Sequence, residues 1–196
     1  MSLEPRFREL WSRLNGPGDP RPFYFDLSQR YSEPHRAYHT LQHLRQCLAE
    51  ADGAPPTVEL ALWYHDAVYQ PLEKDNEAKS ARLVQILPLP QAVVDRAAAL
   101  IRATDHRSPP ADPEAAWLVD IDLSILGQPA EEFDLYEDRI RQEFIALSEE
   151  DFRKGRSAFV RGLLERPAIY STARFRDRYE ARARANLSRS LQRWTG

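Results

Sequence analysis

The chain has 196 residues, of which 42% are hydrophobic and 29% charged, and its formal net charge is −3. This length and balance predict one globular domain over residues 1–196 and give no case for a nucleic-acid polymer or a membrane as a partner. The single cysteine, Cys47, excludes an internal disulfide and a metal cluster built from several cysteines.

Apolar residues recur at helical spacing from one end of the chain to the other, and no convincing stretch alternates with the period of a strand. In chain order, the predicted helices cover about residues 3–14, 23–31, 38–48, 57–66, 75–87, 93–104, 117–126, 133–147, 148–163 and 175–194. No linker, repeat or low-complexity segment separates them. They therefore predict an all-α fold, built as a single helical-bundle domain.

Polar residues, prolines and a glycine mark the predicted helix ends. Thr57, Asp75 and Ser148 are of the types that cap helix N-termini. Pro113 suits a first helical turn. Gly127 ends the predicted apolar helix of residues 117–126. The helix after Thr57 is apolar nearly all round, which predicts burial in the middle of the bundle. The last helix places arginines opposite its apolar face, and we interpret them as a solvated surface.

No stretch of the sequence approaches the ~20 consecutive apolar residues that span a bilayer. The N-terminal segment also lacks the apolar run of a signal peptide. We therefore expect a cytoplasmic protein.

The histidines are unevenly distributed, because all five lie between positions 35 and 106. His39 and His43 are four residues apart, so on one helix they would share a face with Cβ atoms about 5–6 Å apart. One imidazole could then bind a metal ion while the other reaches a substrate. The alternative is a pair of solvated or core histidines on an amphipathic helix.

His65 and Asp66 follow the most apolar predicted helix. A histidine beside a carboxylate in such surroundings costs free energy unless both are satisfied. A shared cation would satisfy both, since imidazole and carboxylate are good ligands for Zn, Mn or Fe. The alternative is a hydrogen-bonded pair that holds two helices together.

Asp120 and Asp122 interrupt another strongly apolar segment. Two residues apart, they cannot share one helical face, so at most one is expected to bind a metal directly. The other would cap a helix, pair with an arginine, or hydrogen-bond to a metal ligand without binding the metal itself.

These motifs resemble the H…HD…D signature of the HD superfamily of metal-dependent phosphohydrolases. The spacing Tyr38-His-x-x-x-His also resembles the start of the catalytic domain of cyclic-nucleotide phosphodiesterases. More closely, five blocks in this order resemble a bacterial family of predicted HD phosphohydrolases: PHRAYHTLQHL (34–44), YHDAVYQPLEKDNEAKSA (64–81), TDH (104–106), DIDLSILG (120–127) and IRQEF (140–144). The resemblance covers about residues 5–192 and implies a helical bundle of the HD type.

The resemblance implies that His43, His65, Asp66 and Asp122 bind one divalent ion, which could be Mn, Mg, Fe, Co, Ni or Zn. It implies Asp122 rather than Asp120 as the ligand, because the Asp-Leu pair matches the final superfamily motif better. His39 becomes the general acid that protonates the leaving oxygen. If His39 is instead the first superfamily histidine, His39 and His43 exchange roles.

Other residues in the matching blocks are candidates for supporting roles. His106 could contact phosphate or bind a second metal ion, or it is simply exposed at a helix end. Asn76 and Glu77 could hydrogen-bond a metal-bound water, although helix capping also explains that block. The cations in these blocks could neutralise phosphate or could form surface ion pairs; they are Arg36, Lys79 and Arg141.

The sequence has no glycine-rich phosphate loop and no nucleophilic serine or cysteine in a recognisable setting, so chemistry would require an activated water. The hypothesis is a metal-dependent phosphohydrolase acting on a nucleotide or another small phosphoester. One alternative is an HD-type oxygenase with two irons. Another is a helical binding or regulatory module that a metal ion only braces.

Overall fold

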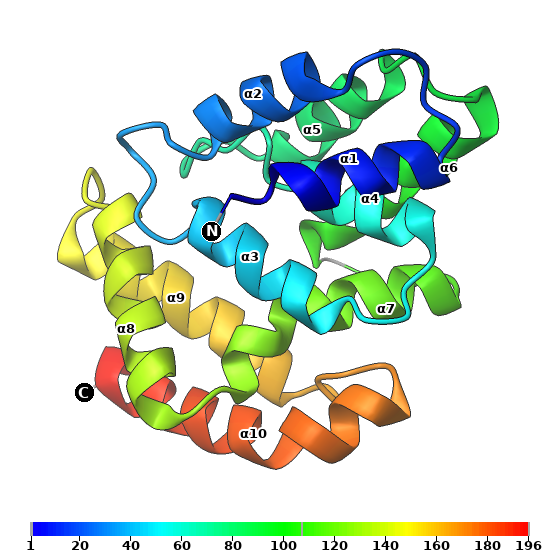
Figure 1. Cartoon of the computed structure of the whole chain (residues 1–196). Helices are drawn as coiled ribbons and strands as arrows, with labels where there is room; N and C mark the ends of the chain where they lie inside the picture. The colour runs from blue at the N-terminus through cyan, green and yellow to red at the C-terminus, as the bar shows by residue number, and fades with distance from the viewer. Residues whose placement is uncertain (1, 107, 196) are drawn as a thin grey trace. The chain divides into compact units, whose positions relative to one another are not determined.

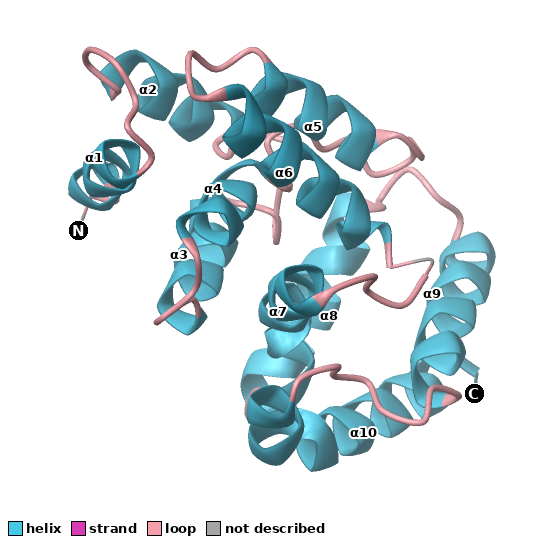
Figure 2. Cartoon of the chain, turned by 90° about the vertical axis from the view of Figure 1, so that its right-hand side faces the viewer, coloured by secondary structure: helices cyan, strands magenta, loops and turns pink. Residues whose placement is uncertain are grey.

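A computed structural model describes residues 2–106 and 108–195. In these ranges the chain forms ten α-helices and two short 3-10 helices and no strand, which confirms the all-α prediction (Figures 1 and 2). The chain divides into two compact units, residues 1–121 and 122–196. A single domain therefore stays a prediction. Among the described residues, no helix is both long enough and apolar enough to cross a membrane.

The first unit contains seven α-helices and one 3-10 helix. They are α1 (Glu4–Arg13), α2 (Arg21–Arg30), α3 (Leu41–Glu50), α4 (Pro56–Tyr64), α5 (Asn76–Gln85), α6 (Gln91–Arg102), η1 (Ala103–Asp105) and α7 (Pro113–Asp122), whose last residue is the first of the second unit.

Helix α4 is the core of the first unit, as its uniformly apolar sequence predicts. All of its residues from Val58 to Tyr64 are buried, and it packs against α1, α3, α5 and α6. The one charged residue inside it, Glu59, is satisfied by Arg6 at 2.6 Å and Arg13 at 2.9 Å. His65 occupies the C-cap position of this buried helix, directly after Tyr64.

Two predicted helix starts are wrong. Helix α3 begins at Leu41 rather than near Tyr38, because Thr40 is its N-cap and accepts a hydrogen bond from the Gln42 N–H at 3.2 Å. Helix α4 begins at Pro56, whose fixed φ suits a first helical position, so Thr57 lies inside the helix instead of capping it. Asp75 does occupy the N-cap position of α5, but its side chain makes no capping hydrogen bond.

Helix α7 is anchored at its start. The Oδ1 atom of Asp112 accepts hydrogen bonds from the N–H groups of Glu114 and Ala115, both at 3.0 Å. Arg96 of α6 donates to both carboxylate oxygens of Asp112 and to Glu114. Pro113 lies in the first turn, as predicted. The predicted α-helix through Leu126 is wrong, because the backbone tightens to a 3-10 helix after Asp122.

The second unit contains this 3-10 helix, η2 (Leu123–Gly127), followed by α8 (Ala130–Glu143), α9 (Glu149–Leu164) and α10 (Ala173–Thr195). Gly127 is required where η2 meets α10, since an added Cβ atom would lie 2.5 Å from the Cβ of Tyr179. Ser148 caps α9 as predicted, accepting from the Asp151 N–H. The arginines of α10 lie mostly exposed opposite its buried apolar face, which confirms that prediction.

Candidate metal centre

Two histidines from different helices meet inside the first unit. His43 lies in the first turn of α3, and His65 directly follows the last residue of α4. Their Nε2 atoms are 3.1 Å apart, and both residues are buried. The packing of α3 against α4 therefore produces this imidazole pair.

The position of one proton on His65 is identified by the hydrogen bond of its Nδ1 atom. Nδ1 lies 2.7 Å from the carbonyl oxygen of Leu62. Because a carbonyl can only accept, Nδ1 carries a proton, and Nε2 is the acceptor when the ring is neutral. This arrangement is typical of a metal-binding histidine, whose second nitrogen is oriented by a backbone carbonyl.

Asp66 brings a carboxylate to the same place. Its Oδ2 atom lies 3.0 Å from His65 Nε2 and 3.5 Å from His43 Nε2, and its side chain is 18% exposed. Burial by itself would raise the pKa of the Asp66 carboxyl. The charges of His65 and His39 and hydrogen bonds from both buried histidines outweigh it and hold that pKa well below its ordinary value.

These atoms require a shared positive charge. With a neutral His65 ring, Nε2 and Asp66 Oδ2 are both acceptors, so a separation of 3.0 Å is repulsive unless a proton or a metal ion lies between them. With metal–ligand bonds of about 2.1 Å, neighbouring ligand atoms lie roughly 3.0 Å apart in an octahedron and roughly 3.4 Å apart in a tetrahedron. The separations among His43, His65 and Asp66 fit the edges of such a polyhedron.

Helix α7 supplies a further carboxylate. The boundary between the two units falls inside α7, after Ile121, so Asp122 ends a helix whose preceding residues all belong to the first unit. The donor atoms of His43, Cys47, His65 and Asp122 lie within 4.8 Å of one another, which makes this group a possible metal-binding site. Asp120, two residues earlier in the helix, is fully buried and is not a member of the group.

Cys47 was not singled out from the sequence. It follows His43 by one helical turn on α3, and this i, i+4 spacing is the signal that could have identified it. Its sulfur is nearly equidistant from the two ring nitrogens of His43, at 3.7 Å from Nδ1 and 3.6 Å from Nε2. The thiol therefore lies against the ring rather than along the lone pair of either nitrogen.

His39 lies outside α3, so the predicted shared helical face for His39 and His43 is wrong. The two rings are nevertheless neighbours, with centroids 5.7 Å apart. The His39 ring stacks on the Tyr69 ring at 4.0 Å and is partly exposed. The structure thus places one histidine inside the buried group and the other beside it, at its more accessible edge.

Arg36 has a different position from the one expected of a phosphate ligand. Its side chain is 0% exposed. Nη1 donates to the carbonyls of His39 and Asp66, Nη2 donates to Ala67, and Nε donates to Glu33. Nη2 also lies 3.0 Å from the Glu33 carboxylate. These five contacts match the five N–H groups of a guanidinium, which leaves none for a phosphate.

Two residues of α5, the helix after the loop that follows Asp66, also have protein partners. Near the surface, Lys79 forms ion pairs with Glu73 and, at 2.9 Å, with Asp75. Such surface ion pairs are the alternative to phosphate binding for this lysine. The Asn76 amide accepts from the Gln70 N–H at 3.0 Å and donates to the Gln70 carbonyl at 2.9 Å, so it braces the loop. Glu77 is partly exposed in the first turn of α5.

Two further predicted residues are His106 and Arg141. His106 follows η1 with a left-handed backbone, at φ 55°, and is partly exposed. Arg141 belongs to the second unit, where its guanidinium donates to Glu149 and to the carbonyls of Phe144 and Leu147. It therefore fastens the loop between α8 and α9.

Comparisons with protein-family models, with curated proteins and with solved structures find no match for this chain. The candidate centre therefore rests on its own geometry.

Proposed function

We propose that the chain is a metal-dependent phosphohydrolase that acts on a nucleotide or another small phosphoester. The observation that carries the proposal is the convergence of His43 Nε2, His65 Nε2 and Asp66 Oδ2, within 3.0–3.5 Å of one another, beside the partly exposed His39. Buried donors next to an accessible imidazole suit a metal-assisted hydrolysis better than a purely structural role.

His43, His65, Asp66 and Asp122 would hold the ion. When bound, a divalent ion acts as a Lewis acid on a phosphoryl oxygen and acidifies a water molecule. The Leu62 carbonyl keeps the proton of His65 on Nδ1, so that Nε2 stays available as a ligand. Cys47 and the ring of Tyr38, whose centroid is 4.7 Å from that of His43, restrict the orientation of the His43 ring.

His39 is the proton donor in this proposal. Its stacking on Tyr69 fixes the plane of the imidazole while leaving an edge accessible. An imidazole there would protonate the departing oxygen as the ester bond breaks. This role requires no direct bond between His39 and the metal, which agrees with its position outside α3.

Purified protein tested on nucleotides, phosphomonoesters and phosphodiesters with Mn²⁺, Mg²⁺, Co²⁺ or Ni²⁺ should hydrolyse at least one of these esters. The variant His39→Ala should lower kcat about 100- to 10,000-fold, as the loss of a general acid does, while it retains metal binding. No turnover across the panel by a protein that binds the metal would contradict the proposal.

One observation favours a second candidate, a helical module braced by a metal. The group of His43, Cys47, His65 and Asp122 offers four donors, enough to close a tetrahedral zinc site without an open position. In that case the bound metal would stabilise the fold, and removing it would lower the melting temperature. The metal-bound protein would hydrolyse no phosphoester. An HD-type oxygenase would instead require two irons and dioxygen uptake, which iron counting would reveal.

A further inference from the structure

We infer that Arg36 is a positioning residue that holds the metal ligand Asp66 and the proton donor His39 in a fixed relationship. This inference rests on the proposed function of the same site. It assigns Arg36 to the assembly of the centre instead of to phosphate binding.

Arg36 joins two separate loops. One loop, residues 33–39, leads into α3, and the other, residues 66–70, follows His65. A single nitrogen, Nη1, donates to the carbonyl of His39 at 3.0 Å and to that of Asp66 at 2.7 Å. The backbones that carry the proposed acid and a proposed ligand are therefore tied to one atom.

The surroundings of Arg36 leave it little freedom. The rings of Tyr31 and Tyr69 lie near its guanidinium, with centroids 5.3 and 5.6 Å away. Glu33 supplies the counter-charge at 3.0 Å from both Nε and Nη2. A buried cation without such partners would be strongly unfavourable, so the two loops and the arginine stabilise one another.

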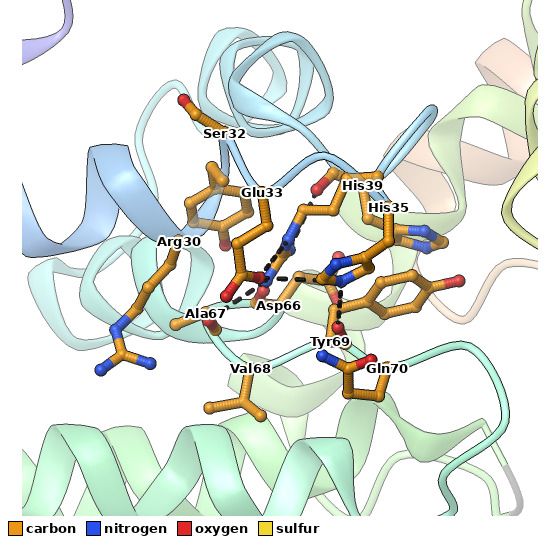
Figure 3. Close-up of polar contacts among 12 residues, drawn as sticks. Arg30, Ser32, Glu33, His35, His39, Asp66, Ala67, Val68, Tyr69 and Gln70 are labelled. Carbon is orange, nitrogen blue, oxygen red and sulfur yellow. Dashed lines mark hydrogen bonds and ion pairs between the residues drawn. The ribbon is translucent and has the colours of Figure 1, made fainter.

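A second set of contacts joins the same two loops. His35 donates from Nε2 to the Tyr69 carbonyl at 2.7 Å, and the Tyr69 ring stacks on His39. Figure 3 shows Glu33 and His35 pointing toward the loop of Asp66, Ala67 and Tyr69. We call this set of contacts between residues 33–39 and 66–70 the clasp.

The clasp needs the planar fork of an arginine. A lysine at position 36 would keep the charge but has one nitrogen with three donors, and it cannot meet acceptors spread around a plane. Arg36→Lys should therefore release both loops at once. Supporting groups behind a metal ligand are typically worth about 10- to 100-fold in metal affinity.

The test compares Arg36→Lys with Arg184→Lys. Arg184 is a matched control, because its guanidinium also binds one carboxylate, Glu180, and three backbone carbonyls, but in the second unit. Co²⁺ affinity and the visible Co²⁺ spectrum report the centre. Hydrogen exchange of metal-free protein reports the peptides spanning residues 33–40 and 64–72.

We expect Arg36→Lys to weaken Co²⁺ binding by about tenfold or more, alter the Co²⁺ spectrum and speed exchange in both peptides together. Arg184→Lys should change none of these. Unaltered Co²⁺ affinity and spectrum in a folded Arg36→Lys protein would overturn the inference, as would faster exchange in only one peptide.

If Arg36→Lys does not fold, Glu33→Gln provides the second test, because it keeps an acceptor but removes the counter-charge. It should change affinity and exchange in the same direction and to a smaller degree, and a folded Glu33→Gln protein indistinguishable from wild type would overturn the inference. Failure of the wild-type protein to bind Co²⁺ would instead contradict the proposed function. In that case, hydrogen exchange in the two peptides of the metal-free protein would still test whether Arg36 holds the two loops together.

Discussion

The Nε2 atoms of His43 and His65 lie 3.1 Å apart, although the residues belong to different segments of the chain. This short separation depends on α3 packing against the fully buried α4. It also depends on the Leu62 carbonyl, which holds the His65 proton on the opposite side of the ring.

Replacing His65 should remove the proposed centre. We expect His65→Ala to lower Co²⁺ affinity at least about 100-fold, since the loss of a direct ligand exceeds the ~10- to 100-fold cost of losing a supporting partner. Titration calorimetry measures this. His35→Ala is the histidine control and should have a smaller effect, because His35 contacts a backbone carbonyl at the partly exposed edge. Equal effects of the two variants would contradict the assignment.

The position of Cys47 against the His43 ring predicts the Co²⁺ spectrum. We expect no intense near-ultraviolet charge-transfer band from thiolate to Co²⁺, and Cys47→Ala should retain metal binding. Because Cys47 is the only cysteine in the chain, any such band would have to come from it. A band that disappears in Cys47→Ala would show direct coordination and would favour the metal-braced module over the hydrolase.

The start of α7 should be sensitive to acid. The hydrogen bond from Arg96, followed by the Ala115 N–H, lowers the pKa of Asp112 from an ordinary value of 3.8 to about 2. A lowered carboxyl pKa stabilises the fold above that ordinary value, and the contribution is lost as the pH falls toward the folded-state pKa.

Asp112→Ala should cost about 1 kcal/mol at pH 7 through loss of the cap. Asp112→Asn should cost less, because asparagine can still cap and solvent screens the partly exposed ion pair. Urea unfolding at several pH values measures both. The difference between wild type and Asp112→Asn should shrink from about pH 4 to pH 2, and a gap that widens over this range would be inconsistent with the lowered pKa.

In the second unit, Glu137 should be the most sensitive charged residue. It pairs with the buried Arg156, and its Oε2 accepts from Ser190 at 2.9 Å and from the Trp194 indole at 2.6 Å. Glu137→Ala should destabilise by about 3–5 kcal/mol, because it leaves a buried guanidinium without its partner. Asp138→Ala, which breaks an exposed pair with Arg193, should cost no more than about 1 kcal/mol. Similar losses in calorimetry would argue against this account.

Much of the fold could be predicted because helical periodicity and burial agree. Helix α4 is the clearest case, since its unbroken apolar sequence requires the central position that it occupies. The first residues of α3 and α4 were harder to predict. Tyr38 continues the apolar stripe of α3 although Thr40 caps that helix, and Pro56 begins α4 one residue before the polar Thr57. In both cases local backbone chemistry overrides the periodic pattern.

The centre could be predicted in part, because a histidine and a carboxylate after an apolar helix have to be satisfied. The sequence could not reveal what Arg36 contacts, since three of its acceptors are backbone carbonyls, which every residue possesses. Cys47 was missed for another reason. A buried thiol is common in a core, so its i, i+4 spacing from His43 becomes informative only together with its short distance from the His43 ring.

The five contacts of Arg36 also bear on how this protein can diverge during evolution. Lys79 has exposed ion-pair partners, so related chains could exchange or lose this cation with little effect. Position 36 should accept neither lysine nor a neutral residue unless position 33 changes with it. An alignment of relatives should therefore show Arg36 to be as invariant as His39 and Asp66, whose carbonyls it binds, and any exchange at position 36 should be accompanied by a change at position 33.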